Sequence, residues 1–290
     1  MVNKLLAVIA AVVITSGSVA ESRESAVQKG LRFYNEGKYA EALKAFHISK
    51  PRELDRRAYL AWGLSAYRMG KFESAAMKLE KAAGMGKPDG DTWALTAECH
   101  LKSGNPGKAL QAVRKTAPLK VSSRGEVDLL WGSIAEASGA YGEAAQKYRS
   151  ALGENPDKEF DIRAGLGRVL AGLGDYSGSI ENFTRAAKLK PGDAEAFSGL
   201  GYAYLKSGML AQAEESLLTA ASLAPGLAPV WYNLACAQSK QGKVENACAS
   251  LSKAFETGFN DVNGALSDDD LAGLRGKECF LKLTRRIPVK

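Results

Sequence analysis

Histidine and cysteine, the side chains used most often in nucleophilic and transition-metal chemistry, are few in this sequence. Its two histidines, His47 and His100, stand 53 residues apart and share no cysteine or serine partner. Four cysteines in 290 residues are too few for a scaffold built on disulfides, and their spacings match no zinc pattern. The sequence therefore predicts no catalytic residue and no metal site.

Glycine-rich strings can cradle nucleotide phosphates, but here each string lacks the rest of the motif. Gly165–Gly167 and Gly199–Gly201 have neither the third glycine nor the preceding strand of a dinucleotide fingerprint. The segment 104–108 lacks the spacing and the Ser or Thr of a phosphate loop, and Asp268–Asp270 lacks the alternating ligands and central glycine of a calcium loop. We expect no cofactor and no enzymatic activity.

The first 20 residues have the pattern of a secretory signal. Lys4 precedes an apolar run over 5–14, and the small residues Ser18 and Ala20 flank Val19 before the expected cut. The run is shorter than the roughly 20 apolar residues of a membrane-spanning helix. We expect cleavage before Glu21 and a soluble periplasmic or secreted chain; an uncleaved membrane anchor is the alternative.

The charge pattern argues against nucleic acid as a partner. The formal net charge is +7, and it falls to +6 when Lys4 leaves with the signal. The basic residues never form a run, whereas nucleic-acid binding usually needs a concentrated basic face.

About 270 residues remain after removal of the signal, which fits one large repeat array or two ordinary domains.

A glycine recurs through most of the chain with a nearly constant period. Its spacings are 33, 34, 35, 35, 34 and 34 residues. The positions are Gly37, Gly70, Gly104, Gly139, Gly174, Gly208 and Gly242. Such a period predicts a repeat architecture in which each unit is one helical hairpin and the glycine makes the turn.

Aligned on these glycines, other columns hold residues of one size. Small residues stand seven positions before the glycine, at Gly30, Gly63, Ala97, Gly132, Gly167, Gly201 and Ala235. They also stand five positions after it, from Ala42 to Ala247, and twelve after it, from Ser49 to Ala254. Large side chains stand nine positions after it, at Phe46, Leu79, Val113, Tyr148, Phe183, Leu217 and Leu251. Two helices can approach closely only where neither carries bulk, so these columns favour packed hairpins.

These columns resemble the tetratricopeptide repeat, a 34-residue helical hairpin. The sixth unit follows the pattern nearly throughout, with Phe197, Leu200, Gly201, Tyr204, Ala213, Leu217, Ala220 and Pro225. Ser179 and Ala97 depart from it elsewhere but keep their positions small. The resemblance implies an all-α fold, a right-handed α-solenoid of about seven such repeats over 21–261, of the exported bacterial type.

The last part of the chain, 262–290, leaves the period and is expected to cap the array. Ser267 with Asp270 reads as a capping box that opens a short helix, and a second short helix carries Phe280. In hairpins of this family the position of Cys248 faces the following unit, here the cap with Cys279. A disulfide between them would fasten the cap; ordinary buried thiols are the alternative.

The resemblance also places the first helix of each hairpin along a concave groove. The residues predicted to line it are Val27, Leu31, Tyr34, Leu60, Leu64, Tyr67, Arg68, Glu98, Leu101, Lys102, Arg168 and Tyr202. We expect the aliphatic and aromatic strip of the first units to be exposed and to bind a helix or an extended peptide. The segment 21–26 or a second copy of the chain could cover it instead. The Lys and Asn clamp of chaperone-binding relatives is absent.

We therefore expect a protein-binding adaptor in a cell-envelope or secretion assembly. The alternative is a self-associating scaffold, a homo-oligomer whose groove is filled by another copy or by the chain's own N-terminal segment.

Overall fold

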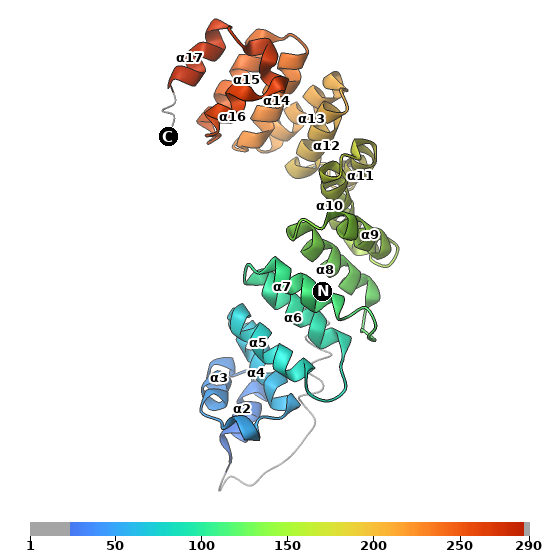
Figure 1. Ribbon diagram of the computed structural model, residues 1–290, viewed down its shortest axis with the longest axis vertical. Coiled ribbons are helices and arrows are strands. Elements are labelled where there is room, and N and C mark those ends of the chain that lie inside the picture. Colours follow the sequence, from blue (N-terminus) through green and yellow to red (C-terminus); the bar gives the residue numbers. More distant parts are fainter. Residues whose placement is uncertain (1–23, 287–290) are drawn as a thin grey trace. The chain divides into compact units, whose positions relative to one another are not determined.

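The computed structural model describes residues 24–286, and in this range the chain forms helices and no strand. Successive helices pair into hairpins (Figure 1). The hairpins are α2 (Ala26–Asn35) with α3 (Tyr39–His47), α4 (Arg56–Arg68) with α5 (Phe72–Ala83), α6 (Gly90–Lys102) with α7 (Pro106–Arg114), α8 (Arg124–Ala137) with α9 (Tyr141–Leu152), α10 (Glu159–Gly172) with α11 (Tyr176–Leu189), α12 (Ala194–Lys206) with α13 (Leu210–Leu223), and α14 (Ala228–Lys240) with α15 (Val244–Glu256).

The chain divides into two compact units. The first unit, Met1–Asn155, holds the hairpins from α2 to α9 and the short 3-10 helix η2 (Pro51–Glu53). The second unit, Pro156–Lys290, begins with the 3-10 helix η3 (Pro156–Lys158) and holds the hairpins from α10 to α15. It ends with α16 (Val262–Ser267), the 3-10 helix η4 (Asp269–Leu274) and α17 (Glu278–Arg286).

The recurring glycine makes the turn inside each hairpin, as predicted. All seven adopt positive φ angles, from 70° at Gly70 to 79° at Gly174. A side chain would be strained in this left-handed backbone region, which glycine enters without a steric penalty. The period read from the sequence is therefore the period of the turns.

The small and large columns meet inside each hairpin. A Cβ atom on Gly167 would lie 2.7 Å from the Phe183 ring, and one on Gly201 would lie 2.5 Å from Leu217 Cγ. The large column is buried throughout, with Phe46, Leu79 and Leu251 fully enclosed. The absence of a side chain on the first helix thus makes room for a bulky one on the second, and the predicted packing is confirmed.

The cap differs in detail from the prediction. Ser267 ends α16, where its hydroxyl donates to the carbonyl oxygens of Asn263 and Gly264, so it does not open the next helix. Asp268 is the N-cap of η4 instead, and its side chain accepts from the Asp270 backbone N–H at 2.8 Å. The predicted capping box at Ser267 is therefore wrong, because the carboxylate one residue later competes better for the free N–H groups.

The cap buries its own apolar residues. Leu271 and Leu274 are fully buried with the side chains of the last hairpin, and Phe280 on α17 is 2% exposed. Cys248 on α15 and Cys279 on α17 are joined in a disulfide, with Cα atoms 6.1 Å apart. Apolar packing and a covalent link thus both attach the cap to the last hairpin.

The predicted signal segment cannot be compared with the structure, whereas the expectation about membrane-spanning helices can be compared with the described residues. The predicted signal, residues 1–20, and the cut before Glu21 fall outside residues 24–286. Within that range no helix is both long enough and apolar enough to cross a membrane.

Candidate functional site

The apolar strip predicted for the first unit is largely part of its core. Val27 is 8% exposed, and Leu60 and Leu64 are 1% exposed each, in one cluster with the buried Leu95. Leu31 and Tyr34 are half-buried against the same cluster. The prediction that Val27, Leu60 and Leu64 form an exposed strip is wrong, because aliphatic side chains at these positions pack into the cluster rather than face solvent.

The polar residues predicted for the first unit do come together. Tyr67 on α4 donates its hydroxyl hydrogen to Glu98 Oε1 on α6 at 2.9 Å, and Lys102 Nζ lies 3.5 Å from the same oxygen. Burial raises the pKa of the Glu98 carboxyl against the lowering effects of Tyr67 and Lys102. Arg68 is exposed, and Leu101 is half-buried. The hydrogen bond between Tyr67 and Glu98 ties two repeats together.

The second unit has a recess on the first helices of its hairpins, where Arg168 and Tyr202 were predicted to line a groove. It has a volume of about 320 Å³. Its lining comprises Arg168, Ala171 and Gly172 from α10, Phe183 from α11, Ser198, Gly199 and Tyr202 from α12, and Asn233 from α14. The structure thus brings Arg168 and Tyr202 to one recess, hereafter the second-unit pocket.

Polar and aromatic groups give this pocket its chemistry. Arg168 Nη1 donates to Glu195 Oε1 at 2.7 Å, and both side chains of this ion pair are well exposed. A Cβ atom on Gly199 would lie 2.3 Å from Phe183 Cζ, so the glycine makes room for the edge of this buried ring. A guanidinium, a phenol and an aromatic ring around one recess suit a peptide with a carboxylate beside an apolar side chain.

Sequence reasoning missed part of this pocket. The sequence places Gly199 only in an incomplete nucleotide-binding string, and Phe183 only in the column of large side chains. The available signal was the second glycine two residues before the packing glycine, which recurs at Gly165 in the preceding hairpin.

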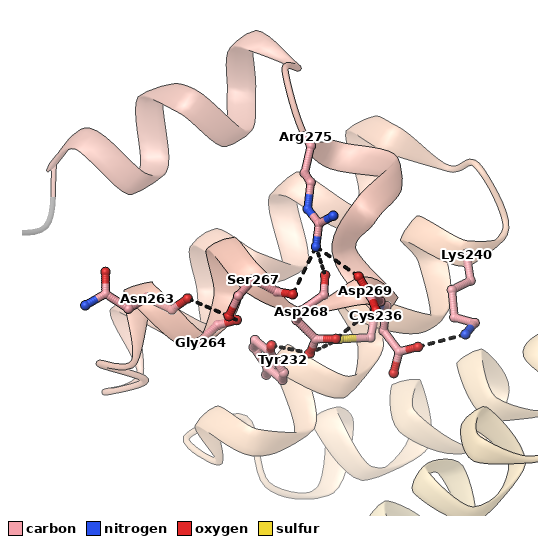
Figure 2. Close-up of polar contacts among 10 residues, drawn as sticks. Tyr232, Cys236, Lys240, Asn263, Gly264, Ser267, Asp268, Asp269 and Arg275 are labelled. Atoms are coloured by element: carbon pink, nitrogen blue, oxygen red, sulfur yellow. Dashed lines mark hydrogen bonds and ion pairs between the residues drawn. The ribbon is translucent and has the colours of Figure 1, made fainter.

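Further along α12 and α14, the chain's own cap occupies the helices. Tyr232 Oη donates to Asp268 Oδ2 at 2.6 Å, and Cys236 Sγ lies 4.0 Å from the same oxygen (Figure 2). Lys206 and Lys240 each place Nζ 2.7 Å from a carboxylate oxygen of Asp270. Two lysines and a tyrosine of the last two hairpins thus hold two carboxylates of the cap; we call this the capped stretch.

The charges of the capped stretch neutralise one another. Burial, the largest influence, acts to raise the pKa of Asp270, but the hydrogen bonds from Lys206 and Lys240 hold this pKa below its usual range. The hydrogen bond to Asp270 in turn raises the pKa of Lys206. Arg275 fixes the turn by donating to the carbonyl oxygens of Ser267 and Asp268 (Figure 2). Asp268 and Asp270 therefore serve as internal ligands of the last repeats.

No cluster of three or more potential metal ligands occurs among the residues that the structure describes. His100 is buried and its Nε2 lies 3.0 Å from Glu80 Oε1, whereas His47 is exposed.

Known structures with the same fold are tetratricopeptide repeat proteins. MamA residues 41-end from Desulfovibrio magneticus RS-1 is 21% identical, with a TM-score of 0.53 over 58% of this chain and 94% of that one. YrrB, described as a TPR protein with an unusual peptide-binding site, is 24% identical, with a TM-score of 0.52 over 63% and 93%. The C-terminal part of a TPR repeat-containing protein from Cytophaga hutchinsonii is 16% identical, with a TM-score of 0.55 over 68% and 78%.

Family models agree with this likeness, although no relative was found among curated proteins. Models described as tetratricopeptide repeat match residues 60–120, 194–226 and 228–257, and one described as TPR repeat matches 167–208. These matches fall in both units and on the hairpins whose glycine turns and packing columns are described above. The chain belongs to the tetratricopeptide repeat family, and its fold is an all-helical array of such repeats.

Proposed function

We propose that this protein is an adaptor outside the cytoplasm that binds a peptide of a partner protein in the second-unit pocket. The observation that carries the proposal is the convergence of Arg168 and Tyr202 on one recess of about 320 Å³. Tetratricopeptide repeats generally serve protein–protein interaction, and YrrB is a relative in fold with a peptide-binding site. The recess, rather than the strip of the first unit, is the better place for a ligand.

The ion pair between Arg168 and Glu195 is of a kind that a ligand carboxylate can replace. Its ion pair with Glu195 is solvent-exposed, and exposed ion pairs contribute about 0–1 kcal/mol. A carboxylate on an incoming peptide could therefore take the place of Glu195 at little cost. The ring of Tyr202 then offers an apolar contact next to the charge.

The location is proposed from the signal-like segment alone. Lys4, the apolar run over 5–14 and the small residues before Glu21 support export. An adaptor role in a cell-envelope or secretion assembly would follow from that location.

Site-specific crosslinking would test the pocket. A photoreactive phenylalanine analogue in place of Tyr202, expressed in the native cells, should crosslink to a partner protein identified by mass spectrometry. Arg168→Glu should reduce the crosslinked product about tenfold, because it repels the carboxylate that the guanidinium would hold.

Arg185→Glu is the matched control. Arg185 is also exposed and forms a surface ion pair with Glu159 at 3.1 Å, but it does not line the pocket. Equal crosslinking by the two charge-reversal variants would rule out the pocket as the binding site. Crosslinks between two copies of this chain alone would favour the self-associating scaffold, and light scattering would then show oligomers that grow with concentration.

A further inference from the structure

A second recess lies in the first unit, between the second helices of its first two hairpins. It has a volume of about 510 Å³ and opens between α3 and α5. Leu43, Ile48, Trp62 and Met69 provide its apolar lining, in which Ile48 is 76% exposed and Met69 46%. We call it the α3/α5 groove. An aliphatic side chain as exposed as Ile48 beside a recess marks a surface suited to contact with another molecule.

Every ionised side chain that lines the α3/α5 groove is basic. Lys44, Lys71 and Lys78 stand around the apolar lining, together with His47, and none of the lining residues is acidic. The next recess of the same unit, between α5 and α7, mixes Glu73 and Glu80 with lysines. The positive charge is therefore a feature of the α3/α5 groove rather than of every such recess in the array.

The Trp62 side chain lines the groove and is held in place by its neighbours. The Trp62 ring stacks against Phe46, with centroids 5.8 Å apart, and against Tyr59 at 6.3 Å. Lys78 Nζ lies 4.1 Å from the centroid of the Trp62 ring. A tryptophan held in place loses little conformational entropy on binding, and such residues dominate the binding energy of many interfaces.

We infer that the α3/α5 groove docks an acidic segment of another protein, with one large apolar side chain in the recess and flanking carboxylates on Lys44, Lys71 and Lys78. Charge complementarity selects the acidic partner, since carboxylates would face cations only. A recess favours a protein segment over a lipid surface, because membrane-binding helices bury apolar side chains that project into the bilayer. This site is in the first unit and does not depend on the second-unit pocket.

The test uses the full mature chain and a labelled synthetic peptide. The probe is a fluorescein-labelled peptide with one phenylalanine and one leucine flanked on both sides by glutamates and aspartates. Fluorescence anisotropy should report binding that weakens as salt rises. The same peptide with lysines in place of its acidic residues should bind at least about tenfold more weakly.

Charge reversal locates the site. The double variant Lys44→Glu with Lys78→Glu should lose at least about tenfold in affinity for the acidic peptide. The matched control is Lys50→Glu with Lys81→Glu, since both are exposed lysines that do not line the groove. The control should bind as the unchanged protein does, and far-UV circular dichroism should show equal helicity in both.

Ile48→Ser tests the apolar contact without disturbing the fold, because this side chain is mostly in solvent. The affinity for the acidic peptide should fall about three- to tenfold, the range expected for the loss of one apolar contact. Equal binding by all variants, or no binding of the acidic peptide, would overturn the proposal. So would binding to vesicles of anionic phospholipid, or dimerisation in sedimentation, that depends on Lys44 and Lys78 while the peptide does not bind.

Discussion

Gly167 decides how closely α10 and α11 can approach, because the Phe183 ring occupies the place where a side chain would stand. The ring is 2% exposed and is enclosed on all sides, so it has little freedom to move away. The same relation holds between Gly132 and Tyr148 in the first unit. At these positions glycine is required by a neighbouring side chain and not by the backbone, since their φ angles are helical.

Two glycine-to-alanine changes should therefore have opposite effects. Gly167→Ala should lower the free energy of unfolding by about 1–3 kcal/mol through overpacking against Phe183. Gly142→Ala in α9 has nothing within 4 Å of the new Cβ atom and should raise it by about 0.5–1 kcal/mol, because alanine is the better helix former. Urea unfolding followed by circular dichroism measures both, and a loss at Gly142 as large as that at Gly167 would contradict the packing argument.

At the scale of the element, the cap depends on one carboxylate between two lysines. The pKa of Asp270 is lower in the folded protein than in the unfolded chain, so its ionised form favours folding. This contribution is fully present above about pH 4, the usual pKa of an aspartate, and is lost as the pH falls further through the folded-state pKa.

Asp270→Asn should loosen the cap at neutral pH and matter little in acid. Lys206 and Lys240 are more than a third exposed, so the expected loss is about 1–2 kcal/mol at pH 7 rather than that of a fully buried ion pair. Hydrogen exchange of the amides over 268–274, compared between the variant and the unchanged protein, measures it. The difference should shrink as the pH falls below about 4 and through the lowered pKa of Asp270, and a constant difference would show that ionisation plays no part.

The period and residue sizes were enough to predict the hairpins, because a turn glycine and the small column are local demands of helix packing. They did not predict which side chains neighbouring segments bury. Leu60 and Leu64 occupy positions that face a groove in this family, yet they are buried, and burial depends on neighbouring segments that a repeat pattern does not specify. Asp270 was assigned to a capping box because its two lysine partners are 30 and 64 residues away in the sequence. Long-range pairs of this kind leave no periodic signal.

At the scale of the whole molecule, the two units carry different surfaces. The first unit has an apolar groove ringed by lysines, and the second has a pocket with Arg168 and Tyr202 and a stretch closed by its own cap. In repeat arrays each unit interacts mainly with its neighbours, so changes in one surface should leave the other intact. Variants of Lys44 and of Arg168 should accordingly act independently on their respective ligands.

One mass measurement on protein purified from its native source tests the expected maturation. We expect a chain that begins at Glu21, and a non-reduced mass lower than the reduced mass by two hydrogen atoms, from the Cys248–Cys279 disulfide. Cys99 and Cys236 are free and buried and should stay reduced. A mass that includes Met1–Ala20 would contradict signal cleavage, and equal masses before and after reduction would show four thiols.

The disulfide between α15 and α17 makes the Asp270 carboxylate a tethered competitor for Lys206 and Lys240. The chain anchors the segment on one side and the covalent link anchors it on the other, 31 residues apart in sequence. A ligand held by such a short tether returns to its site at an effective concentration on the order of millimolar. An acidic peptide in solution would have to exceed that value to reach Lys206 and Lys240. At ordinary protein concentrations a partner would therefore meet a ligand-binding face that ends before these two lysines.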